Sequence, residues 1–118
     1  MKLVYRVTGP VAEDLRRTPG LRIASARSNA VFYLDFLEQW DPKSPWADRR
    51  VRLAASTAVD RKAINDAEFL GFAGITGNIV PRHMEFALPI DPPPFDPGRA
   101  RRLLADAGYP NGWSGRRS

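Results

Sequence analysis

The stretch from Pro45 to Ile64 places the strongest constraint on the fold of this chain, because it contains the starts of two helices. Four small apolar residues recur here at i, i+3, i+4 and i+7, the spacing of one face of an α-helix. They are Val51, Ala54, Ala55 and Ala58. Pro45 at the entrance of this helix loses no hydrogen bond, and Asp48 in its first turn interacts favourably with the helix dipole. The small side chains predict that another element approaches this helix closely.

A second helix is predicted directly after the first. Asp60 has the character of an N-cap, and the helix that it begins is expected to run from Arg61 to about Leu70. Ile64 and Ala67 are expected to face inward. On local grounds the two helices form an ordinary helix–cap–helix corner in an α/β core.

A third helix is indicated near the C-terminal end. Asp96 and Pro97 have the residue types of an N-cap and a first helical position. Its apolar stripe is expected to consist of Ala100, Leu103, Leu104 and Ala107. Gly108 then supplies a left-handed stop, and Pro110 follows where a helix cannot continue. The helix is therefore expected over residues 96–108.

Three segments predict strands, and together with the helices they indicate an α/β fold with a small sheet and about three to four helices. Residues 2–8 alternate between apolar and polar side chains, and Leu21 to Ser25 continue this pattern. Residues 30–37 are almost continuously apolar, which is typical of a strand buried on both faces. Residues 11–17 predict a short helix between the first two strands.

The chain is organised into successive regions of different composition. Gly71, Gly74 and Gly77 indicate a flexible connection, and three consecutive prolines, 92–94, force an extended backbone. The regions are a strand-rich part (1–44), a central helix pair (45–70), a Pro/Gly-rich loop (71–95), a helix (96–108) and a frayed tail (109–118).

Composition limits the classes of function. The 118 residues carry a net charge of +5, and 43% of them are hydrophobic, as in a single globular domain. Three of the 18 basic residues are lysine and fifteen are arginine, spread along the whole chain. No basic run interleaved with aromatics resembles a nucleic-acid-binding motif. A basic surface is therefore favoured over nucleic-acid binding.

Candidate chemistry is sparse. His83 is the only histidine and there is no cysteine, so a metal site would lack the three or four ligands that it needs. No serine has the nucleophile-elbow spacing. We therefore expect no enzyme, no metal and no cofactor. The first fifteen residues contain no apolar run of the length of a signal peptide, so no export signal of its own is expected.

Two blocks of the sequence resemble family 5 extracellular solute-binding proteins of ABC importers, the dipeptide-, oligopeptide- and nickel-binding type. The first block is carried by Pro45, Trp46, Asp48, Arg50, Val51, Arg52, Ala54, Ala58, Val59, Asp60, Arg61 and Ile64. The second is carried by Asp96, Pro97, Ala100, Leu103, Leu104, Ala107 to Pro110, Gly112 and Trp113. Upstream, residues 14–25 and 30–36 resemble the family's helix, Pro-Gly turn and paired strands.

The resemblance implies part of one lobe of a two-lobe protein that captures a peptide or similar small solute and delivers it to a membrane permease. The chain is then a truncated substrate-binding component, and its parent is periplasmic. Within this chain we expect Tyr33, Asp35 and Trp40 to be the residues that touch the ligand, because the first two end the buried strand and Trp40 lies beyond them. No catalytic or metal-binding residue is implied.

Two further hypotheses are kept open. An independent basic α/β module that binds nucleic acid or another protein would require the arginines of the central helices to form one exposed stripe. These arginines are Arg49, Arg50, Arg52 and Arg61. Alternatively, the chain buries an exposed apolar patch or sheet edge by self-association.

Overall fold

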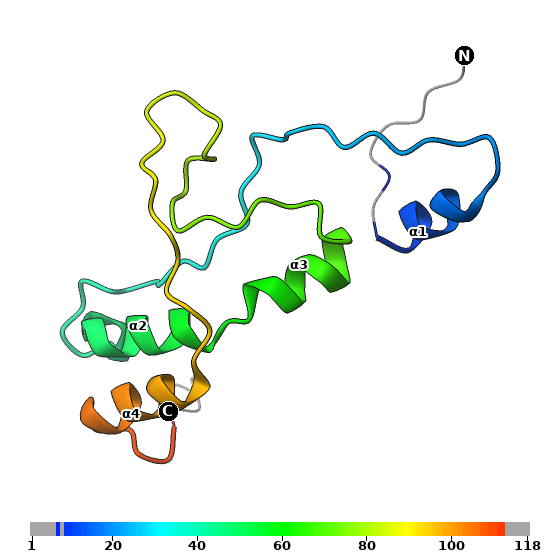
Figure 1. Cartoon of the computed structure of the whole chain (residues 1–118). Helices are drawn as coiled ribbons and strands as arrows, with labels where there is room; N and C mark the ends of the chain where they lie inside the picture. Colours follow the sequence, from blue (N-terminus) through cyan, green and yellow to red (C-terminus); the bar gives the residue numbers. More distant parts are fainter. Residues whose placement is uncertain (1–6, 8, 113–118) are drawn as a thin grey trace.

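Four α-helices and one 3₁₀ turn make up the regular structure in a computed structural model of the chain, which describes residue 7 and residues 9–112 (Figure 1). They are α1 (Gly9–Arg17), η1 (Pro45–Ala47), α2 (Arg49–Ala58), α3 (Arg61–Phe69) and α4 (Pro97–Asp106). Long irregular segments connect α1 to η1 and α3 to α4. The helices predicted at 11–17, 61–70 and 96–108 are thus confirmed, with ends that differ by one or two residues.

The predicted small sheet is wrong, because none of the described residues forms a strand. Residues 21–25 and 30–36 have irregular backbone with no ladder partner, and all but one residue of the predicted strand 2–8 lies outside the described range. Apolar and alternating side chains favour an extended backbone. A strand also needs a second segment whose N–H and C=O groups match its own, and the sequence of one segment carries no information about that neighbour.

The core lies between α2 and α4, which run antiparallel (Figure 1). The start of α4 lies beside the end of α2, where the backbone N–H of Asp96 donates to the Thr57 carbonyl at 2.9 Å. At the other end, Arg50 Nη1 donates to the Asp106 carbonyl at 2.6 Å. Ala54 and Ala100 are both buried, which confirms the prediction that small side chains admit a close neighbour.

The buried face of α2 is shifted from the predicted one. Val51, Ala54 and Thr57 are buried, whereas Ala58 is exposed. The Thr57 hydroxyl lies in this core because it donates to the carbonyls of Leu53 and Ala54, both at 3.0 Å, so that no polar group is left unpaired. Because threonine is polar, the spacing of apolar residues did not predict that position 57 is buried.

Aspartate side chains start three of the helices. The Asp48 carboxylate accepts from the Arg50 N–H at 2.8 Å, Asp60 from Ala63 at 2.9 Å and Asp96 from Arg99 at 2.8 Å. Asp60 and Asp96 confirm the predicted N-caps. Pro45 and Asp48 differ from expectation: Pro45 begins η1, and Asp48 is the residue before α2.

The α3 helix is largely uncovered. It has no buried residue, and its expected inward-facing residues, Ile64 and Ala67, are both exposed. Among the described helices only α1 packs on it, through a small contact in which Gly9 lies near the Glu68 carbonyl. The prediction of an inward face was wrong because an apolar face is buried only where another element covers it.

The described chain is extended, with a radius of gyration of 18.6 Å, against about 13 to 14 Å for a compact domain of this length. Among the described residues, sixteen large apolar side chains are at least 40% exposed, whereas four apolar residues are buried. Much apolar surface is therefore available for contact with another molecule or segment.

Candidate ligand-binding site

The 30–41 segment, which contains the predicted ligand contacts, is held against the helices by two aromatic pairs. The Phe32 and Phe69 ring centroids are 5.4 Å apart, and those of Phe36 and Trp46 are 4.9 Å apart. Phe69 ends α3 and Trp46 lies in η1. Phe36 is half-buried in its pair, whereas Phe32 remains 84% exposed. Both contacts were missed by an interpretation that treated residues 30–37 as a sheet strand.

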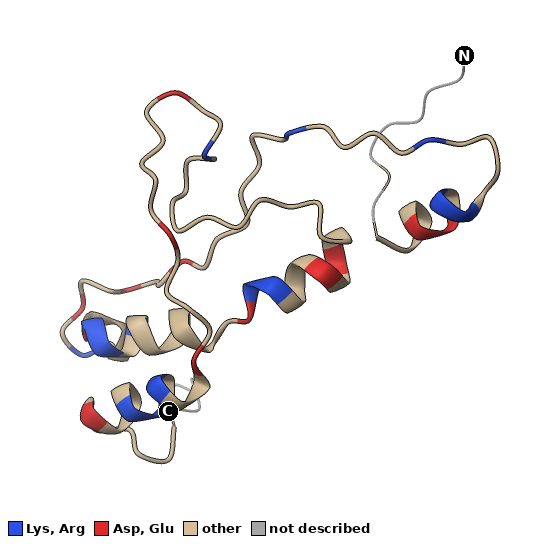
Figure 2. Cartoon of the chain, viewed as in Figure 1, with Lys and Arg blue, Asp and Glu red and all other residues tan. Residues whose placement is uncertain are grey.

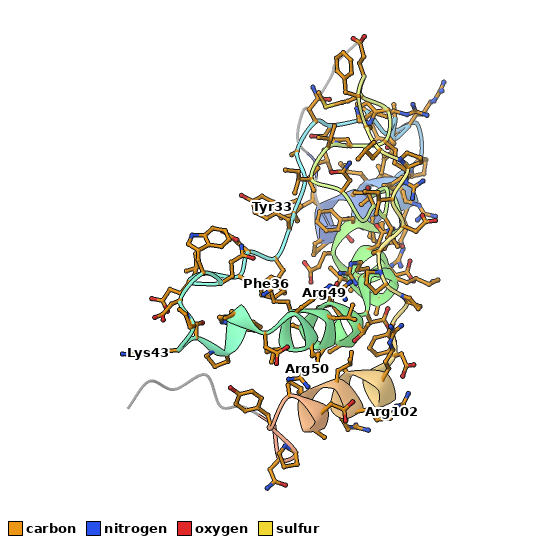
Figure 3. The ribbon with its side chains drawn as sticks, turned by 90° about the vertical axis from the view of Figure 1, so that its left-hand side faces the viewer. Tyr33, Phe36, Lys43, Arg49, Arg50 and Arg102 are labelled. Carbon is orange, nitrogen blue, oxygen red and sulfur yellow. The ribbon has the colours of Figure 1, made fainter. Side chains whose placement is uncertain are left out.

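Tyr33 and Asp35 lie on the side of the segment that faces away from the helices. In an extended chain successive side chains point to opposite sides, so positions 33 and 35 alternate with positions 32 and 36, whose rings pair with Phe69 and Trp46. Tyr33 projects outward in Figure 3, whereas Phe36 points toward α2. Tyr33 is 69% exposed, and neither it nor Asp35 forms a side-chain hydrogen bond within the described residues.

Trp40 lies beyond a tight turn that ends the segment. Glu38 adopts a positive φ of 59°, and the Asp41 N–H donates to the Glu38 carbonyl at 3.0 Å. The Asp41 carboxylate then accepts from the Lys43 N–H at 2.9 Å, which directs the chain into η1. Trp40 is 82% exposed on this turn.

The three predicted residues are all exposed. Two cavities lie elsewhere, and one of them, of about 180 Å³, lies between the start of α3 and Pro92–Phe95. The other, of about 330 Å³, lies beside the end of α4 at 109–112. Neither is lined by residues of the 30–41 segment. The structure therefore offers Tyr33, Asp35 and Trp40 as surface contacts only.

The motif arginines serve the helix ends of this chain. Arg52 Nη1 donates to the carbonyls of Trp46 and Ala47 at 2.5 and 2.9 Å, and so caps the end of η1. Arg61 donates to the Ser56 carbonyl at 2.8 Å and to the Ser56 hydroxyl at 2.9 Å, at the end of α2. A guanidinium group suits this position because it neutralises the negative end of a helix.

Arg50 links the start of α2 to the end of α4, and it lies on the side of α2 that faces α4 (Figure 3). Arg50, Arg52 and Arg61 all form hydrogen bonds with groups of the chain itself. Of the four arginines in the exposed row that nucleic-acid binding would require, Arg49 remains. Other cations are scattered over α4 and the first part of the chain (Figure 2). The geometry therefore does not supply the single arginine stripe that the nucleic-acid hypothesis requires.

The Asp48–Arg50 pair has a clear electrostatic consequence. Arg50 Nε donates to both Asp48 oxygens at 3.1 Å, and Nη2 donates to Oδ2 at 2.6 Å. These side-chain bonds, followed by the backbone N–H of Arg50, lower the pKa of Asp48 below its ordinary value. Asp48 therefore stays ionised, and continues to cap α2, at a more acidic pH than an isolated aspartate.

Replacing Arg50 by glutamine is expected to raise the pKa of Asp48 toward the ordinary value. Because the folded-state pKa is lowered, the stabilisation from the Asp48 cap is complete above the ordinary pKa of about 3.9 and is lost as the pH falls through the lowered value. In Arg50→Gln the folded-state pKa lies closer to the ordinary value, so this stabilisation is smaller and its loss is complete at a higher pH. Carboxylate ¹³C NMR titration of Asp48 measures the midpoint. Arg49→Gln removes the same charge without this bond, and an equal midpoint in the two variants would contradict the assignment.

Metal ligation is not indicated in the part of the chain that the structure describes. No group of three or more histidine, cysteine, aspartate or glutamate side chains gathers there. His83 Nε2 lies 3.1 Å from the Asn29 side-chain oxygen, so the imidazole forms a hydrogen bond within the chain. Among the described helices, none has the length and apolar character needed to span a bilayer.

Residues 2–118 match the family described as bacterial extracellular solute-binding proteins, family 5 Middle. The chain belongs to this family, as the two sequence blocks indicated. The family is described as one of solute-binding proteins.

Two relatives are each similar to this chain over 72 residues. The glutathione-binding protein GsiB of Salmonella typhimurium is 38% identical, and that of Escherichia coli is 39% identical. The alignment covers 61% of this chain and 14% of each relative. The chain thus matches a small part of the length of these proteins.

Proposed function

We propose that this chain is part of the substrate-binding component of an ABC importer and that it contacts a peptide-like solute through Tyr33, Asp35 and Trp40. The observation that carries the proposal is the family match over residues 2–118. In support, the three side chains are exposed and form no hydrogen bond with one another or with the described helices. They belong to a segment that contacts α3 and η1 through Phe32 and Phe36.

The chemistry of the three side chains suits a peptide. The Asp35 carboxylate can accept charge-assisted hydrogen bonds from an α-ammonium group, and the Tyr33 hydroxyl can donate to or accept from an amide. The Trp40 ring offers a flat apolar face to a side chain or to the peptide plane. The relatives are named for glutathione, which is itself a small peptide, so a peptide-like solute is the class that we propose here.

We propose that the protein acts outside the cytoplasm. Its family is described as extracellular, and we propose the periplasm as the compartment and a membrane permease as the acceptor of the solute. Residues 1–118 would then contribute to one lobe of a two-lobe binding protein that closes on its ligand. Neither a covalent step nor a cofactor is part of this proposal.

Isothermal titration of the full chain with reduced glutathione and with di- and tripeptides tests the proposal. We expect saturable binding, and we expect Asp35→Asn to weaken it by about tenfold or more, because a hydrogen bond to a charged group is lost. Asp14→Asn in α1 makes the same charge change at another exposed site and should alter the affinity less than about twofold. Binding of short DNA that weakens steeply with salt would favour the alternative.

Two outcomes would overturn the proposal. One is the absence of heat with every peptide from a chain that still unfolds cooperatively. The other is equal weakening by Asp35→Asn and Asp14→Asn, since this would locate the ligand away from the 30–41 segment.

A further inference from the structure

Residues 36–46 form a closed loop, because the aromatic rings at its two ends pack on each other. The Phe36 and Trp46 ring centroids are 4.9 Å apart, with 38° between the ring planes, and both residues are half-buried. In Figure 3 the chain runs from Phe36 out to Lys43 and then returns toward α2. Compact loops whose ends lie together frequently carry function. This closed loop contains Trp40 and begins directly after Asp35, two of the three proposed ligand contacts.

Successive backbone turns fill the closed loop. The Ser44 N–H donates to the Asp41 carbonyl at 2.9 Å, and the Ala47 N–H donates to the Ser44 carbonyl at 3.0 Å. With the turn already described before position 41, these bonds connect residues 38–47 without interruption. The turn that carries Trp40 is therefore joined to η1 through the backbone.

Trp46 is itself held by hydrogen bonds on both sides of its backbone. Its N–H donates to the Ser44 hydroxyl oxygen at 3.2 Å, and its carbonyl accepts from Arg52 Nη1 at 2.5 Å. Arg52 belongs to α2, which packs on α4 around the buried core. Trp46 thus connects the closed loop to the helix pair that contains the core.

Asp35 lacks a comparable backbone connection. Within the described part of the chain the backbone of residues 31–37 forms no hydrogen bond, so the ring contact of Phe36 is what joins Asp35 to η1. A group that is ordered before the ligand arrives binds more tightly, because the ordering cost is not incurred on binding. The Phe36–Trp46 contact is therefore placed to supply this ordering.

We propose that Trp46 is a positioning residue of the peptide site: its ring holds Phe36 and so sets Asp35 in a defined place relative to Trp40. Trp46 acts through these neighbours, and the inference rests on the function proposed above. A loss of the ring at position 46 should leave the α2–α4 core intact, because its buried residues lie on other turns.

A double-mutant cycle of Trp46→Ala and Asp35→Asn tests this inference, with isothermal titration of the full chain by reduced glutathione and by di- and tripeptides. We expect Trp46→Ala to weaken binding about three- to tenfold, as for the loss of one aromatic pair. In the Asp35→Asn background the same change should weaken binding less than about twofold, because the group that Trp46 positions has lost its charge. Equal weakening in both backgrounds would indicate a merely structural role and would overturn the inference.

Three further variants control for the loss of a large side chain. Trp46→Phe keeps a ring at this position and should bind within about twofold of the parent chain. Phe95→Ala removes a half-exposed ring beside the cavity at the start of α3 and should leave the affinity unchanged. Trp46→Leu takes the place of Trp46→Ala in the cycle if the alanine variant does not unfold cooperatively.

A measurement on the free chain separates this inference from the proposed function. Backbone ¹⁵N relaxation should show a lower order parameter at Asp35 in Trp46→Ala than in the parent chain. An unchanged order parameter overturns this inference alone, and so does a parent chain whose peptide affinity Trp46→Ala leaves intact. A parent chain that binds no peptide overturns the proposed function and this inference together.

Discussion

Replacement of Ala54 by lysine is expected to separate α2 from α4 and to remove the cooperative unfolding transition of the chain. Ala54 is 1% exposed and lies in the core of the α2–α4 pair. A lysine here inserts a long side chain where no space exists and buries an ammonium group without a partner. Changes of this kind cost about 4 kcal/mol or more, a large part of the free energy of unfolding of a small domain. Urea unfolding followed by far-UV circular dichroism measures the loss.

Ala58→Lys is the matched control. It makes the same substitution one turn further along the same helix, where Ala58 is exposed. A lysine near the C-terminus of α2 also interacts favourably with the helix dipole, so the free energy of unfolding should change by less than about 0.5 kcal/mol. A similar destabilisation by both variants would show that α2 does not pack on α4 through the face that contains Ala54.

The helices could be predicted from the sequence because their signals are local. Asp60 and Asp96 bond to backbone groups only three residues away, so short patterns were sufficient to place the starts of α3 and α4. Gly108, with a φ of 94°, follows the end of α4 for the same reason. Hydrogen bonds that form within one helical turn depend on the residues of that turn alone, so the local sequence is sufficient to predict them.

The sheet could not be predicted reliably, because strand pairing depends on residues far away in the chain. Residues 30–37 are apolar, but their contacts are made by Phe32 and Phe36 with aromatic rings of α3 and η1. The same limitation affects burial. The buried position near the end of α2 is Thr57 and not Ala58, because α4 approaches from that side and the threonine hydroxyl is paired within its own helix.

The motifs that identify the family are mostly structural, which explains why the family could be recognised while the ligand contacts remain a proposal. Asp48, Arg50, Arg52 and Arg61 bond to helix ends, and Ala54 and Ala100 pack in the core. A scaffold constrains such positions whatever the solute. Tyr33 and Trp40 have no comparable internal role, and nothing in their local pattern distinguishes a ligand contact from an exposed aromatic residue.

The second large effect is expected from Gly77→Ala, which should open the base of the 77–91 loop. A Cβ atom at position 77 would lie 2.7 Å from the Asp91 carbonyl carbon and 2.8 Å from the Pro92 nitrogen. Both are backbone atoms, so relief requires the two sides of the loop to separate. Overpacking of this kind costs about 1 to 3 kcal/mol. Because the residue 77 N–H donates to the Ile90 carbonyl, its hydrogen-exchange rate, measured by NMR, should rise by about tenfold to a hundredfold.

Gly74→Ala separates this steric effect from the general effect of replacing a glycine. A Cβ atom at position 74 meets no other atom within 4 Å, and the backbone there does not require a glycine. This substitution should leave exchange in the 77–91 loop unchanged and stabilise the chain slightly by restricting the unfolded state. Unaltered protection at residue 77 in Gly77→Ala would show that the loop base is held less closely than the Gly77–Ile90 bond implies.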